Sequence, residues 1–494
     1  MVQATQWFVV AVCGIFAYSG PRPVTPILMR ALYSLEYRGY DSAGIAVQRA
    51  DGRIQVAKRA GRVDELASYI QHAPPAGTFG IGHTRWATHG RVTDLNSHPH
   101  LSTDGRVAVV HNGIVENYRE LKDELICSGY TFRSETDSEA ISHLVSQHLR
   151  TAISLEEAVR LVAKRLQGST AFVAISSTEP GKLVGVRLGH AGGIVVGFCE
   201  NEYFMSSDVL ALLPHTDRVA YVDSEELCVT ANGSTEILGI HGGRSRLMST
   251  HISRKYESAQ KGMYEHFMAK EIADQSHSVT QAMTGRVEFE NGSVRLPEFG
   301  ISKTEVRALR RIVLVGMGTS LHAAMVGAQY IERFAGLPTA AENASEFRYR
   351  SHALSSRDLV VAITQSGETA DTLAAMEQAK RNGARLVAIV ETEGTQATRL
   401  AEHTIPIRAG QEIAVASTKT MMNSLIVLTE LALHLASLRE SISGSDCEVA
   451  VDALSRLPGL IEQLQDLNVE CGRLAKFIGR HDHLLYLGRG SLYP

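Results

Sequence analysis

The sequence is poor in the features that mark secreted, membrane-spanning or metal-binding chains. Its 494 residues contain only six cysteines and two tryptophans. The cysteines are scattered and never form a Cys-x-x-Cys pair, which argues against a disulfide framework or a zinc ribbon and fits a reducing compartment. No stretch approaches the ~18 consecutive apolar residues that a membrane span needs. We therefore expect a cytoplasmic protein with no membrane partner and no metal site.

Neither sign of charge is in excess. The chain has 49 Lys and Arg against 53 Asp and Glu, for a formal net charge of −4. This balance gives no reason to expect nucleic acid or an anionic membrane surface as a partner. The hydrophobic content of 44% is ordinary for a soluble globular protein. The length suggests about three domains, on a prior of ~150 residues per domain.

One cysteine, Cys13, lies between the apolar run WFVVAV and a glycine. It could be a buried core thiol, the lipidated cysteine of a secreted lipoprotein, or a nucleophile that becomes N-terminal once residues 1–12 are gone. Those twelve residues contain no Lys or Arg, whereas a secretory signal needs a basic start and a longer apolar region. The lipoprotein interpretation is therefore disfavoured. The local sequence leaves the core thiol and the nucleophile open, because free cysteines are often buried and inert.

The first half of the chain mixes short strands with a few helices. There is no strict strand–helix–strand alternation, which is typical of an α+β arrangement of layers. The expected strands are 44–48, 79–86, 107–113, 171–176, 192–198 and 226–230, and the expected helices are 25–37 and 138–150.

The pattern of apolar residues changes from about residue 311. Continuous apolar strands now alternate with helices, which predicts a parallel sheet covered on both faces, as in a doubly wound α/β domain. The expected strands begin with RIVLVGMG (311–318) and continue at 358–364, 384–391 and 403–409, followed by a long helix over 417–438.

An internal repeat links two distant segments. RIVLVGMGTS (311–320) and HLLYLGRGSL (483–492) both read as an apolar strand followed by Gly-x-Gly and a nearby hydroxyl residue. An amphipathic stretch, 451–478, leads into the second copy, which stops at Pro494. A lone strand cannot pair its backbone groups, so we expect a C-terminally truncated piece of a longer protein. The alternative is that 483–494 adds an edge strand to the first sheet.

Hydroxyl side chains gather where the strands of the second half end. These places carry GTS (318–320), TQSGET (364–369) and VASTK (415–419). Hydroxyls and helix-start amides at the carboxyl ends of parallel strands can hold a phosphate without a metal. Any one loop alone could be a simple helix N-cap. Three in one sheet favour a phosphorylated small ligand, and because a Walker loop and a full GxGxxG are both missing, ATP, NAD or another cofactor is not expected.

Polar groups also gather in the strand-rich first half, in HTRWATHG (83–90), HNGIVEN (111–117) and SETDSE (134–139). An Arg opposite an Asp can hold the carboxylate and ammonium groups of a free amino acid. An Asn side chain next to a Gly N–H can form an oxyanion hole for acyl transfer. The plainer alternatives are a surface ion pair and an Asn-Gly turn.

Together these motifs resemble two known families in sequence. CGIFAY, SLEYRGYDSAG, HTRWATHG, NSHPH, HNGIVEN and SETDSE resemble the glutaminase domain of class II, N-terminal-nucleophile (Ntn) amidotransferases. SEFRYR, TQSGETADT and VASTK resemble a sugar isomerase (SIS) domain. In this order, and over nearly everything from Cys13 onward, they resemble the glutamine–fructose-6-phosphate aminotransferase family.

The resemblance implies an α+β Ntn-hydrolase-type domain, with stacked sheets between helices, followed by an α/β doubly wound SIS domain. The implied boundaries are an extension (1–12) absent from the mature or correctly started protein, a glutaminase domain (13–235), a linker (236–290), a first SIS domain (291–450) and the start of a second (451–494). It also implies glutamine and fructose 6-phosphate as substrates, and a homodimer formed through SIS domains.

The resemblance also implies residue roles. Cys13 would attack the glutamine amide with its own α-amino group as base, and Asn112 and Gly113 would stabilise the oxyanion. The residues implied for glutamine are Arg85, Trp86, Thr88, His89 and Asp137, with Trp86 gating ammonia. The residues implied for the sugar phosphate are Thr319, Ser320, Thr364, Gln365, Ser366, Thr369, Val415 and Ser417.

Three departures from the family pattern bear on activity. Val12 stands where the family has its initiator Met, and an amine held in a peptide bond cannot act as a base. The isomerase residues of the second SIS domain would lie beyond Pro494, so this chain is expected at most to hydrolyse glutamine and bind sugar phosphate weakly. Met317 stands where many members have Cys. Two other functions stay open: another class II amidotransferase, and a non-catalytic SIS sensor of sugar phosphates.

Overall fold

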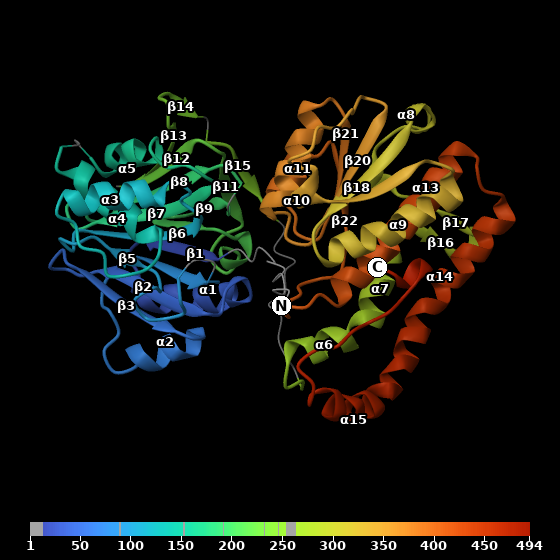
Figure 1. Ribbon diagram of the computed structural model, residues 1–494, viewed down its shortest axis with the longest axis horizontal. Helices are drawn as coiled ribbons and strands as arrows, with labels where there is room; N and C mark the ends of the chain where they lie inside the picture. The colour runs from blue at the N-terminus through green and yellow to red at the C-terminus, as the bar shows by residue number, and fades with distance from the viewer. Residues whose placement is uncertain are drawn as a thin grey trace, which may run out of the picture. The chain divides into compact units, whose positions relative to one another are not determined.

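The computed structural model describes residues 13–87, 90–151, 154–190, 192–231, 233–245, 247–252 and 263–494. The chain divides into two compact units, residues 1–256 and 257–494, and each has its own sheets (Figure 1). The predicted extension 1–12 and the predicted glutamine-binding residues Thr88 and His89 lie outside the described residues.

Unit 1 contains two antiparallel sheets. The first has the strand order β15-β11-β9-β10-β1-β4-β2-β3 and the second the order β14-β13-β12-β8-β7-β6-β5. The strands of the first sheet are β1 (Gly14–Ser19), β2 (Ser42–Gln48), β3 (Ile54–Ala60), β4 (Phe79–Arg85), β9 (Ile194–Cys199), β10 (Glu202–Ser206), β11 (Arg218–Val222) and β15 (Ser249–His251). Those of the second are β5 (His100–Leu101), β6 (Val107–Gly113), β7 (Thr170–Ser176), β8 (Leu183–Leu188), β12 (Glu226–Ala231), β13 (Ser234–Gly239) and β14 (Arg244–Ser245).

The alternation of side chains along β1 shows how the layers of unit 1 pack. Phe16 and Tyr18 point to the helix side of their sheet, where they join a core with α1 (Val24–Leu35) and α2 (Val63–Ile70). Ile15 and Ala17 point the other way, into a core shared with strands of the second sheet. Successive strand residues face opposite sides, so a strand buried on both sides must be apolar throughout.

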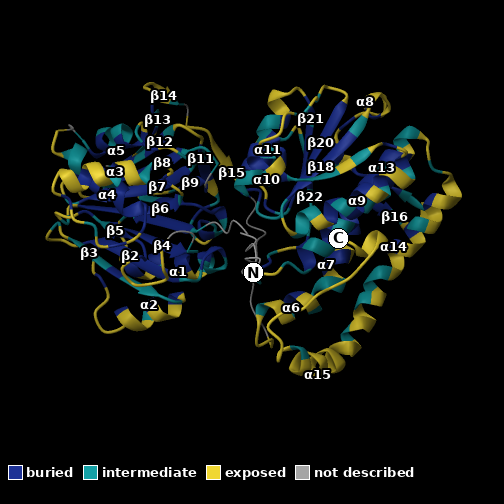
Figure 2. Ribbon diagram, in the orientation of Figure 1, coloured by how far each residue is buried: buried dark blue, intermediate teal, exposed yellow. Residues whose placement is uncertain are grey.

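The second sheet is covered on its outer face by three helices, α3 (Tyr118–Cys127), α4 (Ser138–Leu149) and α5 (Leu155–Ala163), which share a core with it. Unit 1 is thus two stacked sheets between helices, as the resemblance implied. Figure 2 shows the central strands buried and the exposed residues concentrated on outer helix faces, loops and sheet edges.

Unit 2 is built on a parallel sheet with the strand order β19-β18-β20-β21-β22. Its strands are β18 (Arg311–Gly316), β19 (Thr339–Asn343), β20 (Asp358–Thr364), β21 (Arg385–Val390) and β22 (His403–Pro406). Its helices are α9 (Thr319–Ala335), α10 (Ala344–Phe347), α11 (Ala370–Arg381), α12 (Gln396–Leu400) and α13 (Lys419–Arg439). Around them lie α6 (Phe267–Ala273), α7 (Gln275–Met283), α8 (Lys303–Ala308), the hairpin of β16 (Val287–Glu288) and β17 (Ser293–Val294), α14 (Gly444–Leu464) and α15 (Asn468–Ile478).

Helices cover both faces of the parallel sheet. Leu314 on β18 packs in the core with α9 and α13, whereas its neighbour Val315 packs in the core with α10 and α11. The predicted doubly wound α/β domain is therefore confirmed, and its central strands β18, β20 and β21 are apolar because each one is buried on two sides.

Helix α13 corrects one expectation. This helix has 21 residues and a mean hydropathy of 1.5 over an 18-residue window, so by length and composition alone it could cross a membrane. No such run was expected from the sequence. In unit 2, 61% of that window is buried, and α13 packs along α9. A helix surrounded by core can be apolar on all sides without contacting lipid.

The last predicted strand is wrong. The amphipathic stretch before it forms α14 and α15, but residues 483–489 adopt no regular structure, and Leu485 and Tyr486 are 85% and 88% exposed. The alternative, an added edge strand, is wrong as well, since the parallel sheet of unit 2 is complete without this segment. Apolar composition makes a strand only where a neighbouring strand accepts its backbone hydrogen bonds.

Candidate active site

Cys13 lies at the start of β1, beside the end of β4. The register of the two strands pairs Gly14 with Thr84, which brings residue 13 next to the loop that follows Arg85. The backbone N–H of Trp86 donates to Sγ of Cys13 across 3.2 Å, and the same sulfur lies 3.5 Å from the Trp86 carbonyl oxygen. The thiol is half-buried.

Opposing influences act on the Cys13 thiol. Burial raises its pKa, while the N–H of Trp86 and the positive charges of Arg85 and Arg38 lower it; the net effect is a raised pKa. The thiol is thus protonated near neutral pH and needs a base before it can attack a substrate.

The side chain of Asn112 contacts Cys13 from the second sheet of unit 1. It lies near the end of β6, and its Nδ2 donates to the carbonyl oxygen of Cys13 at 2.9 Å. Gly113 follows with a φ of +114°, a conformation that favours glycine. Gly192, with a φ of +62°, packs against the amide so closely that a Cβ there would lie 3.1 Å from Asn112 Nδ2.

Arg85 and Asp137 form the charged part of the site. Arg85 is buried, and its guanidinium donates to the carbonyl oxygens of Gly90 and Arg91 at 3.4 and 3.3 Å. Burial lowers the pKa of Arg85, and the charges of Cys13, Asp41 and Asp137 act against this. Asp137 is also buried, and its Oδ2 accepts the backbone N–H of Val115 at 2.7 Å.

The loop after β4 is held by a second carboxylate. Oδ2 of Asp41 accepts the backbone N–H of Ala87 at 2.8 Å, and the Asp41 N–H donates to the Arg85 carbonyl at 3.0 Å. The indole of Trp86 meets the ring of Tyr40 edge-on, with centroids 4.9 Å apart. These contacts place the predicted residue Trp86 at Cys13.

The structure thus brings together Cys13, Arg85, Trp86, Asn112 and Asp137 in unit 1. Sequence reasoning missed Arg38, whose charge acts on Cys13, and His83, which contacts Asn112. Both residues lie inside motifs that were recognised, SLEYRGYDSAG and HTRWATHG. The motifs therefore pointed to their positions, but nothing in the sequence indicated what these two side chains contact.

In unit 2, two predicted loops lie at the carboxyl ends of neighbouring strands. Thr319 and Ser320 open α9 directly after β18. Thr364 ends β20, and its Oγ1 accepts the Gly367 N–H at 3.3 Å, within the turn that leads to Thr369 at the start of α11. Gln365 and Ser366 belong to that same turn, and Ser366 Oγ accepts the N–H of Glu368 at 3.2 Å.

The third predicted loop, VASTK (415–419), belongs to a longer segment, residues 409–419, that carboxylates hold in place. Glu391 accepts the N–H groups of Ala409 and Gly410, each at 2.8 Å. Glu271 accepts that of Ile413 at 2.6 Å, and Glu412 accepts the hydroxyl of Ser417 at 2.9 Å. Val415 is left 65% exposed between them.

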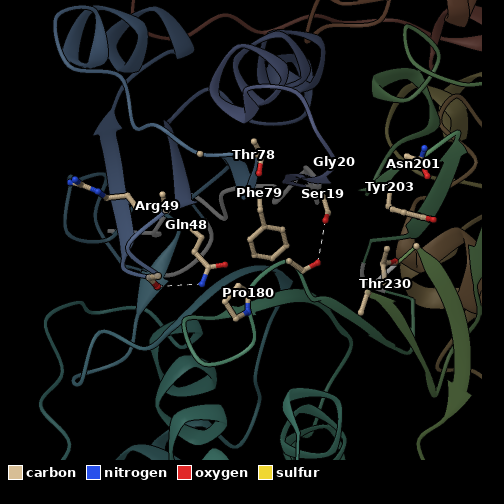
Figure 3. Close-up of a pocket in the computed structure, with 16 residues that line it drawn as sticks. Ser19, Gly20, Gln48, Arg49, Thr78, Phe79, Pro180, Asn201, Tyr203 and Thr230 are labelled. Carbon is tan, nitrogen blue, oxygen red and sulfur yellow. Dashed lines mark hydrogen bonds between the residues drawn. The ribbon is translucent and has the colours of Figure 1, made fainter.

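A cavity of about 630 Å³ lies elsewhere in unit 1 (Figure 3). It is lined by Ser19, Phe79, Thr230 and neighbouring residues. Ser19 is the last residue of β1, and Cys13 directly precedes the first. The cavity is therefore separated from Cys13 by the length of a six-residue strand, about 20 Å. None of the predicted site residues lines this cavity.

Each of the two units matches a known protein family. The family described as "Glutamine amidotransferase domain" matches residues 83–213, and the family described as "SIS domain" matches residues 306–434. The chain is 41% identical over 481 residues to the glutamine–fructose-6-phosphate aminotransferase [isomerizing] of Symbiobacterium thermophilum, covering 97% of this chain and 78% of the relative. It is 41% identical over 484 residues to the Pyrococcus horikoshii protein of the same name, covering 98% and 78%.

The chain belongs to the glutamine–fructose-6-phosphate aminotransferase (isomerizing) family. This confirms the resemblance drawn from the motifs and the expectation of an enzyme of the amidotransferase class.

Solved structures also resemble this aminotransferase-family chain. The C-terminal domain of glucosamine-fructose-6-phosphate aminotransferase from Francisella tularensis is 30% identical with a TM-score of 0.45, over 47% of this chain and 65% of that one. A glutamine phosphoribosylpyrophosphate amidotransferase from B. subtilis is 18% identical with a TM-score of 0.40, over 84% of this chain and 92% of that one.

Proposed function

We propose that this family member hydrolyses glutamine with Cys13 in unit 1 and binds in unit 2 the fructose 6-phosphate that receives the ammonia, as its part in the synthesis of glucosamine 6-phosphate. The names of its relatives support the overall reaction. The observation that carries the proposal is that two donors converge on Cys13, the Trp86 N–H at its sulfur and the Asn112 amide at its backbone carbonyl.

The first chemical step needs a base for the protonated Cys13 thiol. An α-amino group on the same residue has a pKa of ~7.7–8.0, which suits proton transfer near neutral pH. It exists only if the bond to Val12 is absent, so we propose that working protein begins at Cys13. The amine takes the thiol proton, and the sulfur attacks the side-chain carbonyl carbon of glutamine.

The attack gives a tetrahedral intermediate with an anionic oxygen. We assign Asn112 Nδ2 and the Gly113 N–H as donors to that oxygen, where a donor is most effective because the charge forms there. Collapse returns a proton to the leaving nitrogen, releases ammonia and leaves a thioester on Cys13. Water then hydrolyses the thioester to glutamate and regenerates the thiol.

The α-carbon of the glutamine substrate carries both a carboxylate and an ammonium group, which suits a site with charges of both signs. Arg85 is assigned to the α-carboxylate and Asp137 to the α-ammonium group. Thr88 and His89 are assigned to the same substrate from the sequence motif alone, and Trp86 to controlling the exit of ammonia.

In unit 2 we assign the sugar phosphate to the carboxyl edge of the parallel sheet, where hydroxyls meet the N-termini of α9, α11 and α13. The residues assigned are Thr319, Ser320, Thr364, Gln365, Ser366, Thr369, Val415 and Ser417. We further propose a homodimer through SIS domains and a cytoplasmic location. The boundaries proposed for the glutaminase and first SIS domains are 13–235 and 291–450.

The test is glutamate release from glutamine, with and without fructose 6-phosphate, by protein whose N-terminal residue has been sequenced. Activity is expected only in the fraction that begins at Cys13, and Cys13→Ala is expected to abolish it. Turnover by chains that still begin at Met1, or full activity in Cys13→Ala, would refute the proposal.

A further inference from the structure

A buried histidine connects the two sheets of unit 1 beneath the Cys13 site. His83 lies on β4 of the first sheet and is 1% exposed. Its Nε2 lies 3.0 Å from the carbonyl oxygen of His111 and 3.1 Å from Oδ1 of Asn112, both on β6 of the second sheet. Both partners are acceptors, so Nε2 carries the hydrogen and donates to them.

This hydrogen bond, together with the one from Nδ2 to the Cys13 carbonyl, sets which way the Asn112 amide faces. The two ends of an Asn side chain have nearly the same shape but opposite hydrogen-bonding character. A donor at Oδ1 holds the oxygen away from the nucleophile and leaves Nδ2 pointing at the Cys13 carbonyl, 2.9 Å away. The reversed amide would put an acceptor where the reaction needs a donor.

We propose that His83 is a positioning residue for glutamine hydrolysis: its Nε2–H fixes the Asn112 amide so that Nδ2 faces the developing oxyanion. The inference rests on the proposed function of Cys13 and Asn112. It extends that function to a residue that does not itself touch the reacting atoms.

The surroundings keep the His83 ring in one protonation state and one position. Burial and the nearby charge of Arg85 lower its pKa to about 3, so the ring is neutral at any working pH. The ring of His98 stacks on it with centroids 4.1 Å apart and planes 14° apart. Nδ1 of His98 in turn accepts the backbone N–H of His111 at 3.3 Å, which ties the stack to β6.

The neighbouring histidines do not form a metal centre. In the part of the chain that the structure describes, no three His, Cys, Asp or Glu side chains are placed to hold a metal ion. His111 pairs with Ser138 Oγ at 2.8 Å, and His100 with Thr136 Oγ1 at 3.0 Å. The polar partners of the cluster are thus hydroxyls, the Asn112 amide and backbone groups, which suits a hydrogen-bonded support.

Two amide variants of His83 separate positioning from simple packing. The Gln side chain can place an N–H near the position of imidazole Nε2, whereas the Asn side chain is one methylene too short to do so. His83→Gln is expected to keep kcat for glutamine hydrolysis within about 5-fold of the wild type, and His83→Asn to lower it about 100-fold. KM for glutamine should change less than about 3-fold in both, because the interaction acts in the transition state.

A double-mutant cycle tests whether the effect passes through Asn112. In an Asn112→Ala background, His83→Asn should cost less than about 2-fold in kcat, since the group that it positions is gone. His215→Asn serves as the control: this histidine is half-buried in unit 1 and is also stacked on an aromatic ring, that of Phe204 at 4.8 Å, and the substitution should leave kcat unchanged.

The outcomes distinguish this inference from the proposed function. A wild-type chain beginning at Cys13 that fails to hydrolyse glutamine, or a Cys13→Ala variant that retains activity, overturns both. With an active wild type, equal kcat in the Gln and Asn variants of His83, or the same 100-fold loss with and without Asn112, overturns only the positioning role.

Discussion

The backbone N–H of Trp86 donates to Sγ of Cys13 across 3.2 Å, joining the first residue before β1 to the loop after β4. The two residues are 73 positions apart, and the antiparallel pairing of β1 with β4 brings them together. The Asn112 amide reaches the same residue from the opposite sheet, at the Cys13 carbonyl. One donor at the thiol and a second at the carbonyl of the same residue support the role that we propose for Cys13 in acyl transfer.

Removing the Asn112 donor should slow chemistry without weakening glutamine binding. For Asn112→Ala we expect kcat for glutamate release to fall roughly 100- to 1,000-fold, as for other single oxyanion donors, with KM changed less than about 3-fold. Alkylation of Cys13 by iodoacetamide, followed by mass spectrometry, checks that the nucleophile itself remains reactive. An unchanged kcat would exclude Asn112 as an oxyanion donor.

Gly192 should be intolerant of a side chain. A Cβ there would meet the Asn112 amide at 3.1 Å, at a backbone φ of +62°. Gly192→Ala is therefore expected to lower kcat at least 10-fold by displacing the amide. Gly181→Ala is the matched control, since it also has a positive φ, +81°, but nothing within 4 Å of its Cβ. The same kcat loss in both variants would show that backbone strain alone is responsible.

Ser320 should contribute to phosphate binding in unit 2. It lies in the first turn of α9, where its hydroxyl and the helix amides can contact one anion. Ser320→Ala should weaken fructose 6-phosphate binding about 10-fold in calorimetric titration, the size expected for one hydrogen bond to a charged group. Ser441→Ala, whose hydroxyl donates to the Phe334 carbonyl instead, should leave the affinity unchanged. Equal affinities in the two variants would remove Ser320 from the site.

Glu391 should make the stability of unit 2 depend on pH. Burial raises its pKa to about 7, above the ordinary value of 4.5, so the folded state binds a proton that the unfolded chain releases. Its contribution is complete below about pH 4.5 and is lost as pH rises through about 7, by at most about 3 kcal/mol. Scanning calorimetry should show the Tm difference between wild type and Glu391→Gln changing across that window. A constant difference from pH 4.5 to 8 would contradict the expectation.

The contact between α9 and α13 should carry much of the stability of unit 2. Leu428 is fully buried, and Gly327 opposite it has no room for a Cβ, which would come within 3.0 Å of the leucine. Leu428→Ala should lower the free energy of unfolding by about 2–5 kcal/mol through loss of apolar contact and formation of a cavity. Val449→Ala, at a position 70% exposed, should change it by less than about 0.5 kcal/mol. Denaturant titration of both variants measures the difference.

Local patterns in the sequence were enough to predict much of the architecture. The apolar runs of β18, β20 and β21 indicated a parallel sheet covered on both faces, because a strand buried on two sides needs apolar residues at every position. The strand expected at 483–492 did not form for the complementary reason: its run LLYL is apolar, but among the described residues no strand pairs with it. By length and composition, helix α13 resembles a membrane span. Its burial against α9 identifies it as a core helix.

By itself, the sequence determined the two fold classes and their order, the motif residues Cys13, Arg85, Asn112 and Asp137, and the family to which they point. Tertiary structure decided which of these atoms meet. The contacts of Cys13 with Trp86 and Asn112, the hydrogen bond from His83 that orients Asn112, and the carboxylates that hold residues 409–418 join segments distant along the chain. Periodicity is a property of neighbouring residues, whereas such contacts depend on strand register and on how two sheets pack face to face.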